Sequence, residues 1–451
     1  MKPAYGILSW MGRMRGAWLG CALIFWLSGC GDTPSVGPDG PAEVTEMAEK
    51  STVASDSAPK STASRISSEP ISNPHEITVT SAVQQPTEEQ TTASDLTADV
   101  AATDWLFFRG DFAGRGYVKS ATLPEKLDVV WEYWEPKCSY ETSPVVCDGR
   151  VVTTDLDGMV RCLQLSDKKL LWKTPTKFGF TASPSIRNGK IYVGDNDGKF
   201  RRLDLATGAI DWEYQANAQI DSAANFQGDH VIFGSQDANV YSLNTADGSL
   251  AWKHTIDDQV RCSIVVDAGR TAVAGCDAML HVIDANNGTG LAKIELSSQT
   301  AVAPAMVGPL AYFGMENGEF VCAHMEEKKI LWTWKDERQE ASIRGSASVA
   351  DDVVVFGNRG NRVVCLDRMS GEVRWTYRAK RSVESSVLIV GERVYVGDTA
   401  GNFMVLGLKD GNLLQNIELS GGITSAPCLS GNRLLVATQE GIVYCLGATD
   451  K

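Results

Sequence analysis

From residue 104 onward, the chain consists of short runs in which apolar and polar residues alternate, separated by turns rich in Gly, Asn and Asp. Alternation over about four to eight residues predicts half-buried β-strands. Asn, Asp and Gly tolerate the positive φ angles that tight hairpins need. In residues 181–214 the predicted strands are 183–187, 190–194, 199–205 and 209–214, which together form one four-stranded antiparallel unit.

This unit recurs at intervals of about 40 residues, a period typical of repeat architectures. The position of its second turn holds, in order, Gly158, Gly198, Ala238, Ala278, Gly318, Asn361, Gly401 and Gly441. A large residue near the end of the unit recurs as Trp172, Trp212, Trp252, Trp332 and Trp375, with Ala292 and Gln415 in two of the units. One such unit cannot bury both of its faces alone, but eight arranged radially can. The sequence therefore predicts an all-β fold, an eight-bladed β-propeller of four-stranded antiparallel blades.

The two ends of the repeats predict how the ring closes. The eighth unit, 425–449, stops where its fourth strand should begin, which would leave a sheet edge unpaired. Residues 127–133 have the pattern of a fourth strand and precede the first unit. We predict that this N-terminal strand completes the last blade.

The sequence of one repeat resembles the repeat of a known family. Residues 189–212 read Gly-Lys-Ile-Tyr-Val-Gly, then Asp-Gly, Leu-Asp-Leu-Ala-Thr-Gly and Trp. This unit resembles the repeat named for pyrroloquinoline quinone, which quinoprotein alcohol dehydrogenases share with the lipoprotein subunit of the outer-membrane β-barrel assembly machine. The lead-in at 104–111 is similar to the opening of many such propellers. The resemblance covers 104–451 and implies a propeller fold, with either an oxidoreductase or a scaffold role.

The first thirty residues have the order of a secretory signal. Arg13 and Arg15 precede an apolar run at 17–27, and Leu27-Ser28-Gly29-Cys30 resembles the bacterial lipobox, whose cysteine is acylated. An ordinary signal peptide with an unrelated cysteine is the alternative. We expect residues 1–29 to be a lipoprotein signal peptide and Cys30 to anchor the protein in the cell envelope, facing the periplasm. Because Gly31 follows Cys30, the choice between inner and outer membrane stays open.

Residues 30–103 are dominated by Ser, Thr, Ala, Pro and Glu and lack an apolar period, which predicts a disordered linker. Residues 31–103 hold 12 acidic and 3 basic side chains, so much of the net charge of −14 lies outside the repeats. A negative charge excludes nucleic acid as the main partner, because phosphate binding needs a cationic surface.

Candidate chemistry gathers where the chain enters the first strand of each unit, near one mouth of the predicted channel. This position holds Glu141, Thr181, Asp221, Arg261, Ala301, Arg344, Glu384 and Thr424. The residue before it is apolar in almost every unit. One interpretation is a ring of salt bridges, with Asp221–Arg261 and Arg344–Glu384 on neighbouring blades. The other is a polar binding site for a ligand or a peptide.

The resemblance to quinoproteins implies a carboxylate base, a calcium ion and a disulfide between adjacent cysteines. No two cysteines are adjacent here, and Arg261 and Arg344 oppose a cation beside the ring carboxylates. The turns at 155–158 and 195–198 fit hairpins better than calcium loops. The histidines (His75, His230, His254, His281 and His324) are scattered, and no nucleophile elbow or phosphate loop is present. We therefore expect no catalytic residues, metal or cofactor, with a quinone-dependent dehydrogenase as the alternative.

Nine cysteines follow Cys30. Cys162, Cys322, Cys365 and Cys445 share one third-strand position and are expected to be small buried residues, whereas Arg202 at that position has no evident reason. Cys262 and Cys276 flank the hairpin turn at 267–270 symmetrically and form a candidate disulfide. Cys138 and Cys147 have no assigned role.

These patterns favour a non-catalytic, membrane-anchored scaffold that binds envelope proteins, including components of outer-membrane protein assembly. Two alternatives stay open. The first is a quinoprotein-like oxidoreductase, and the second is a ligand-sensing propeller that uses the charged ring.

Overall fold

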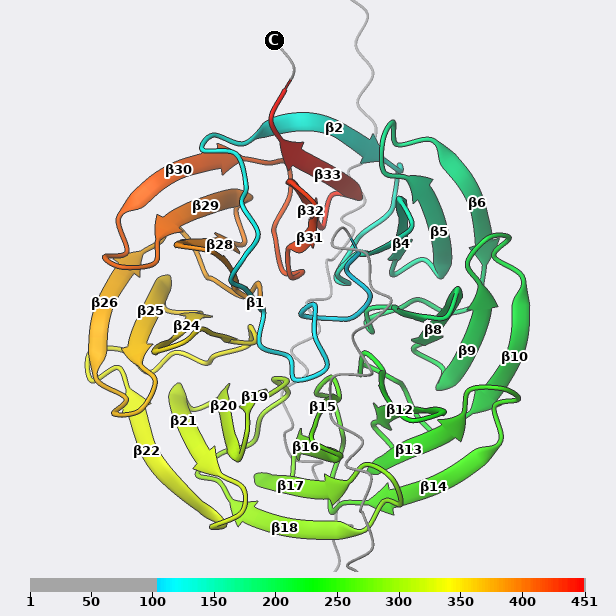
Figure 1. Ribbon diagram of the computed structural model, residues 1–451, viewed down its shortest axis with the longest axis horizontal. Coiled ribbons are helices and arrows are strands. Elements are labelled where there is room, and N and C mark those ends of the chain that lie inside the picture. Colours follow the sequence, from blue (N-terminus) through cyan, green and yellow to red (C-terminus); the bar gives the residue numbers. More distant parts are fainter. Residues whose placement is uncertain (1–103, 450–451) are drawn as a thin grey trace, which may run out of the picture. The chain divides into compact units, whose positions relative to one another are not determined.

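A computed structural model of the protein describes residues 104–449 (Figure 1). The predicted signal peptide at 1–29, the lipidation site Cys30 and the linker at 30–103 lie outside the described residues. Within 104–449 every regular element is a β-strand, and no helix is long and apolar enough to cross a membrane.

Eight sheets stand around a central axis as the blades of a propeller (Figure 1), so the predicted fold is confirmed. Blade 1 consists of β3 (Val145–Cys147), β4 (Arg150–Thr154), β5 (Met159–Gln164) and β6 (Leu170–Pro175), and blade 2 of β7 (Ser185–Arg187), β8 (Lys190–Gly194), β9 (Lys199–Asp204) and β10 (Ile210–Gln215). Blade 3 consists of β11 (Asn225–Gln227), β12 (His230–Ser235), β13 (Asn239–Asn244) and β14 (Leu250–Thr255), and blade 4 of β15 (Val265–Asp267), β16 (Arg270–Ala274), β17 (Met279–Asp284) and β18 (Gly290–Glu295). Blade 5 consists of β19 (Ala305–Val307), β20 (Leu310–Gly314), β21 (Glu319–His324) and β22 (Lys329–Lys335). Blade 6 consists of β23 (Ser348–Val349), β24 (Val353–Asn358), β25 (Arg362–Asp367) and β26 (Val373–Arg378). Blade 7 consists of β27 (Leu388–Val390), β28 (Arg393–Gly397), β29 (Asn402–Gly407) and β30 (Leu413–Glu418).

The last blade draws on both ends of the described chain. Its three inner strands are β31 (Cys428–Ser430), β32 (Arg433–Ala437) and β33 (Ile442–Gly447), and β2 (Asp128–Trp134) pairs antiparallel with β33 as the outermost strand. The predicted closure is thus confirmed. Strand β1 (Tyr117–Val118) was not predicted. It adds to blade 7 as a fifth strand, parallel to β27.

The recurring second-turn position explains the repeat spacing. All eight of its residues have positive φ, from 56° at Ala278 to 86° at Gly401. Positive φ is strained for side chains with a Cβ, so Gly is the default there and Asn is tolerated. The turn therefore fixes where each hairpin folds back, even in the two repeats that carry alanine.

The recurring tryptophan and the glycine of the third turn form one contact between blades. Trp172 Nε1 donates a 3.0 Å hydrogen bond to the carbonyl oxygen of Leu205 on the next blade, and its indole covers Gly208. A Cβ on Gly208 would lie 2.4 Å from Trp172 Cε3. The same pairing joins Trp212 with Gly248, and Trp375 with Gly411. In these blades the contact joins the outer strand to the next blade.

The strand opposite each tryptophan explains both the cysteines and the one arginine. Cys162 faces Trp172 across the strand pair and is fully buried, as expected for a small residue under an indole. In blade 2, Arg202 faces Trp212, lies over its ring at 5.7 Å and pairs with Asp211 at 2.9 Å. Arg202 therefore replaces a buried thiol with a cation–π contact and an ion pair.

Candidate functional site at the channel mouth

The eight ring positions predicted from the repeat all line one cavity, with a volume of about 160 Å³. Each lies just before the innermost strand of its blade, and the residue that precedes it, apolar in every blade but the fifth, is buried. In blade 3 this residue is Ile220, which packs on Gly194 of blade 2, where a Cβ would lie 2.2 Å from Ile220 Cγ2. The apolar neighbour anchors the backbone, so the ring side chain is left to face the cavity.

Asp221 is the most heavily hydrogen-bonded member of the ring. Its carboxylate accepts from Thr181 Oγ1 at 2.7 Å, Gln219 Nε2 at 2.5 Å and Gln236 Nε2 at 2.6 Å. The predicted pair with Arg261 is present with a separation of 3.8 Å. Asp221 is therefore held in place by its neighbours on blades 2 to 4.

The second predicted pair, Arg344 with Glu384, is wrong. Arg344 pairs with Glu316 on the preceding blade at 3.3 Å, and Glu384 pairs with Arg359 at 3.2 Å. Glu316 and Arg359 lie in the second turns of blades 5 and 6, between β20 and β21 and between β24 and β25. Because the prediction considered only the ring itself, it missed both partners.

Charges of opposite sign occupy opposite arcs of the mouth. Glu384, Glu141 and Asp221 lie on blades 7, 1 and 3, separated by Thr424 and Thr181, whereas Arg261 and Arg344 lie on blades 4 and 6. Although Glu141 is exposed to the open mouth, desolvation by the surrounding protein raises its pKa above the ordinary value, and the charges of Asp221 and Glu384 raise it further. The ring side chains alone are thus dipolar, and Glu316 and Arg359 of the second turns place a charge of opposite sign beside each arc.

A layer of serines beneath the ring links the blades. Ser183 Oγ accepts the backbone N–H of Ser143 at 2.9 Å, and Ser386 Oγ accepts that of Ser346 at 3.0 Å. Ser143 Oγ accepts the N–H of Ala426 at 2.8 Å and so joins the last blade to the first. The sequence analysis missed this layer, although serine stands two residues after the ring position in five of the eight repeats.

The lead-in segment 105–118 forms the floor of the cavity. It crosses the centre of the ring (Figure 1), and its residue Phe108 lines the cavity. Its backbone carbonyls accept N–H groups from the innermost strands of six blades, namely Trp105 from Val146, Leu106 from Ile186, Phe112 from Val266, Ala113 from Met306, Arg115 from Val349 and Gly116 from Ile389. The segment therefore ties these six blades together.

Arg109 fastens this segment to blade 6. Its side chain is buried, and Nη2 donates to the carbonyl oxygen of Ala347 at 2.8 Å and to Ser348 Oγ at 3.0 Å. Burial lowers the pKa of Arg109 to about 9. The only sequence signal for this contact was the resemblance of the lead-in to other propellers.

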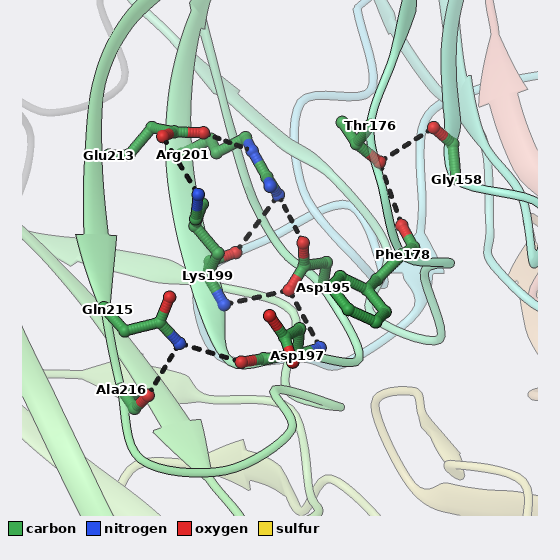
Figure 2. Close-up of polar contacts among 10 residues, drawn as sticks. All are labelled: Gly158, Thr176, Phe178, Asp195, Asp197, Lys199, Arg201, Glu213, Gln215 and Ala216. Atoms are coloured by element: carbon green, nitrogen blue, oxygen red, sulfur yellow. Dashed lines mark hydrogen bonds and ion pairs between the residues drawn. The ribbon is translucent and has the colours of Figure 1, made fainter.

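The second turn of blade 2, which resembled a calcium loop, uses its carboxylates internally. Figure 2 shows that Asp195 Oδ1 accepts the N–H groups of Asp197 and Lys199 at 3.0 and 2.9 Å, while Oδ2 accepts Arg201 Nη1 at 2.7 Å. Arg201 Nε in turn donates to Glu213 at 2.8 Å. Asp195 is buried, and its charge is balanced by Arg201. The turn is thus a hairpin stabilised by a buried ion pair.

Two other groups of residues bring three possible metal-ligand atoms within 4.8 Å of one another; they are Asp104, Cys147 and Asp148, and Cys138, Asp155 and Asp157. In the second group, Asp155 pairs with Arg161 and accepts a hydrogen bond from Cys138 Sγ at 3.2 Å, so a cation already balances it. In the first group, burial raises the pKa of Cys147 to about 12, which keeps the thiol protonated and a poor ligand. We assign no metal to either group.

The predicted Cys262–Cys276 disulfide is absent. Both residues are buried thiols, as are the other seven cysteines of residues 104–449. The hairpin register pairs Val265 with Ala272, which sets Cys262 opposite residue 275 rather than 276. A shift of one residue turns the two side chains to opposite faces. Cys276 therefore lies one residue past the position that faces Cys262 across the hairpin.

Pyrroloquinoline quinone, the cofactor that the repeat name implies, does not fit the residues of this mouth. A cavity of about 150 Å³ holds a single benzene ring, and the cavity here is about 160 Å³, whereas the quinone has three fused rings. It also carries three carboxylates, which would meet three ring carboxylates and only two ring arginines, each already paired with a carboxylate of the protein.

The sequence and the fold both resemble known proteins. The profile of the family described as outer membrane protein assembly factor BamB matches residues 115–263 and 258–451. BamB of Legionella pneumophila (strain Paris) is 24% identical over 163 residues, which are 36% of this chain and 41% of that protein. BamB of Burkholderia pseudomallei (strain K96243) is 29% identical over 157 residues, 34% of this chain and 40% of that protein. The matched part thus spans about 40% of the length of these relatives.

Two solved structures show the same fold. BamB from Moraxella catarrhalis superimposes with a TM-score of 0.63 at 19% identity, covering 72% of this chain and 99% of that chain. Quinohemoprotein alcohol dehydrogenase from Comamonas testosteroni superimposes with a TM-score of 0.67 at 13% identity, covering 80% and 83%. At these identities the likeness concerns the fold alone. The family profile covers most of the described residues, and the chain therefore belongs to the family of outer membrane protein assembly factor BamB.

Proposed function

We propose that this protein is a non-catalytic scaffold that binds other proteins at the bacterial cell envelope during outer-membrane protein assembly. Membership in the BamB family supports this role. A lipid anchor at Cys30, followed by the linker at 30–103, would hold the propeller near a membrane on the periplasmic side. The observation that carries the proposal is the outer surface of the propeller.

This outer surface bears a belt of exposed aliphatic side chains, which we call the rim belt. It consists of Val129, Leu171, Ile210, Leu250, Leu291, Leu331, Val373, Leu413 and Leu414, which are 39% to 54% exposed. Every outermost strand contributes at least one of them, within its first three residues. Such exposed aliphatic side chains can add apolar contacts to a partner that binds along the rim.

The backbone of the same strands adds a second means of binding. Strands β6, β10, β14, β18, β22, β26, β30 and β2 end their sheets, so one edge of each is unpaired within the described residues. An extended peptide can add to such an edge through main-chain hydrogen bonds, while aliphatic side chains contribute apolar contacts. The rim therefore suits extended segments of envelope proteins.

Crosslinking followed by capture of the full-length protein from membranes tests this proposal. We expect outer-membrane assembly proteins to be recovered with it. Recovery of the folded propeller with no protein partner would contradict the scaffold role.

We also propose that the protein is not a quinone-dependent dehydrogenase, because the channel mouth does not fit the quinone. Dye-linked alcohol oxidation after addition of quinone and calcium is the direct check. Turnover above that of a boiled sample would contradict this proposal.

A further inference from the structure

One carboxylate of the channel mouth has no counter-charge of its own. Among the described residues, Asp221 pairs with Arg261 and Glu384 pairs with Arg359, but Glu141 makes neither a hydrogen bond nor an ion pair. Its strongest electrostatic neighbours are the like charges of Asp221 and Glu384. A carboxylate placed between two others is stabilised only by a cation or by hydrogen-bond donors.

Two hydroxyl groups that line this cavity also lack partners. Thr424 lies between Glu384 and Glu141 in ring order, and its Oγ1 is buried without a hydrogen bond. Ser346, on blade 6, is only 4% exposed and lines the same cavity, and its hydroxyl has no partner among the described residues. Buried polar groups in folded proteins are nearly always hydrogen-bonded. The position of these hydroxyl groups at the cavity indicates that a bound group satisfies them.

The acceptors on one side match the chemistry of an ammonium group. A primary ammonium has three N–H donors and no acceptor, and blades 7, 8 and 1 offer Glu384, Thr424 and Glu141 in succession. Arg261 and Arg344 on the opposite arc disfavour a second positive charge there, and each already pairs with a carboxylate of the protein, Asp221 or Glu316. A single ammonium group therefore matches the acidic arc.

The size of the cavity restricts what accompanies the ammonium group. Phe108 closes the floor, and the volume is about 160 Å³. This space accommodates about as much as one aromatic ring, so it admits a free amino acid or the first residue of a peptide. A folded domain or a long polymer cannot enter.

We propose that the channel mouth is a binding site for the ammonium end of an amino acid or peptide, with Glu141 as its counter-ion and Thr424 as a hydrogen-bond acceptor. This function is separate from protein binding at the rim. A free amino acid and a peptide N-terminus present the same ammonium group, so the experiment must distinguish these two sources.

Titration calorimetry on the full chain, with four probes, tests the site. L-alanine carries both charges, N-acetyl-L-alanine lacks the ammonium group, L-alaninamide lacks the carboxylate, and tri-L-alanine presents the same end on a peptide. We expect L-alanine or tri-L-alanine to bind, the tighter of the two identifying the source. N-acetyl-L-alanine should bind at least about tenfold more weakly, because it cannot make the charged hydrogen bonds, whereas L-alaninamide keeps the ammonium group and should still bind.

Variants locate the binding. E141Q should weaken binding of the preferred probe by about tenfold or more, and T424V should weaken it to a smaller extent. E132Q makes the same chemical change on β2, where Glu132 is exposed, and should leave binding unaltered. Capture of envelope proteins should be unchanged in E141Q, so failure at the mouth and failure at the rim give different results. Equal binding of L-alanine and N-acetyl-L-alanine, unchanged binding by folded E141Q, or no binding of any probe at 10 mM (a concentration about tenfold above a 1 mM dissociation constant) would overturn the proposal.

Discussion

Trp131 Nε1 donates a 2.8 Å hydrogen bond to the carbonyl oxygen of Leu165. Trp131 lies on β2, the outermost strand of the last blade, whereas Leu165 follows β5 in the first blade. This contact repeats, at the junction between the two ends of the ring, the tryptophan contact that joins other neighbouring blades. The ring is therefore closed by the same interaction that builds it.

Removing this contact should weaken the whole propeller. Trp131 is 7% exposed, so W131A should lower the free energy of unfolding by about 3–5 kcal/mol, as other buried large-to-small changes do. Trp134 lies on the same strand and is 62% exposed, so W134A should change it by less than about 0.5 kcal/mol. Urea unfolding of both variants measures the difference. Equal effects would show that β2 does not close the ring through Trp131.

Two glycine-to-alanine variants distinguish the effect of packing against tryptophan from the effect of backbone strain on the free energy of unfolding. Gly208 and Gly189 have φ of 73° and 68°, but a Cβ on Gly208 would meet Trp172 whereas one on Gly189 has nothing within 4 Å. G208A should therefore lower the free energy of unfolding by about 1–3 kcal/mol more than G189A, the usual cost of overpacking. Thermal unfolding of the pair checks this, and equal losses would contradict the close packing.

Glu141 should make stability depend on pH. Its raised pKa means that the folded state binds its proton more tightly than the unfolded state does. The resulting cost to folding is present at neutral pH and disappears as pH falls through the raised pKa toward 4.5, the ordinary value. Asp221, Glu384, Arg261 and Arg344 face the same mouth and are unaltered in E141Q. Without ligand, E141Q should thus unfold at a higher temperature than the native chain at pH 7 and at the same temperature near pH 4. A lower unfolding temperature for E141Q at pH 7 would contradict this.

The cysteines should be unreactive in the folded protein. Desolvation raises the pKa of Cys162, Cys262 and Cys365 to about 12, and every cysteine of the described chain is buried. Because the thiolate is the reactive form, a thiol reagent at pH 8 should label them only after denaturation. Peptide mapping without reduction should recover Cys262 and Cys276 in separate peptides. A linked pair would show that the hairpin register differs from the one described.

The sequence predicted most of the fold because each repeat carries its own local signals. Strand alternation and positive-φ turns are read within about 40 residues, and β2 was recognisable because Val129 and Trp131 fit the fourth-strand pattern. The ring positions followed from the same register. The position of a residue within its repeat can be read from nearby sequence. Residues at the same position of every repeat then lie around the axis of the propeller.

The contacts that sequence reasoning missed join residues from different repeats or lie outside the repeat. Arg344 binds Glu316 and Glu384 binds Arg359 because second turns reach over the mouth. Arg109 reaches Ala347 from a segment with no repeat pattern. The Cys262–Cys276 prediction failed because one residue of strand register decides which face a side chain occupies.

The most direct test of the scaffold role places a photocrosslinking residue on the rim belt in living cells. Leu171, Leu291 and Leu331 are suitable positions, and Thr181 inside the mouth is the control. We predict adducts with outer-membrane assembly proteins from the rim positions and none of these adducts from Thr181. Absence of protein adducts from all three rim positions, with the protein folded and present in the envelope, would contradict the scaffold role.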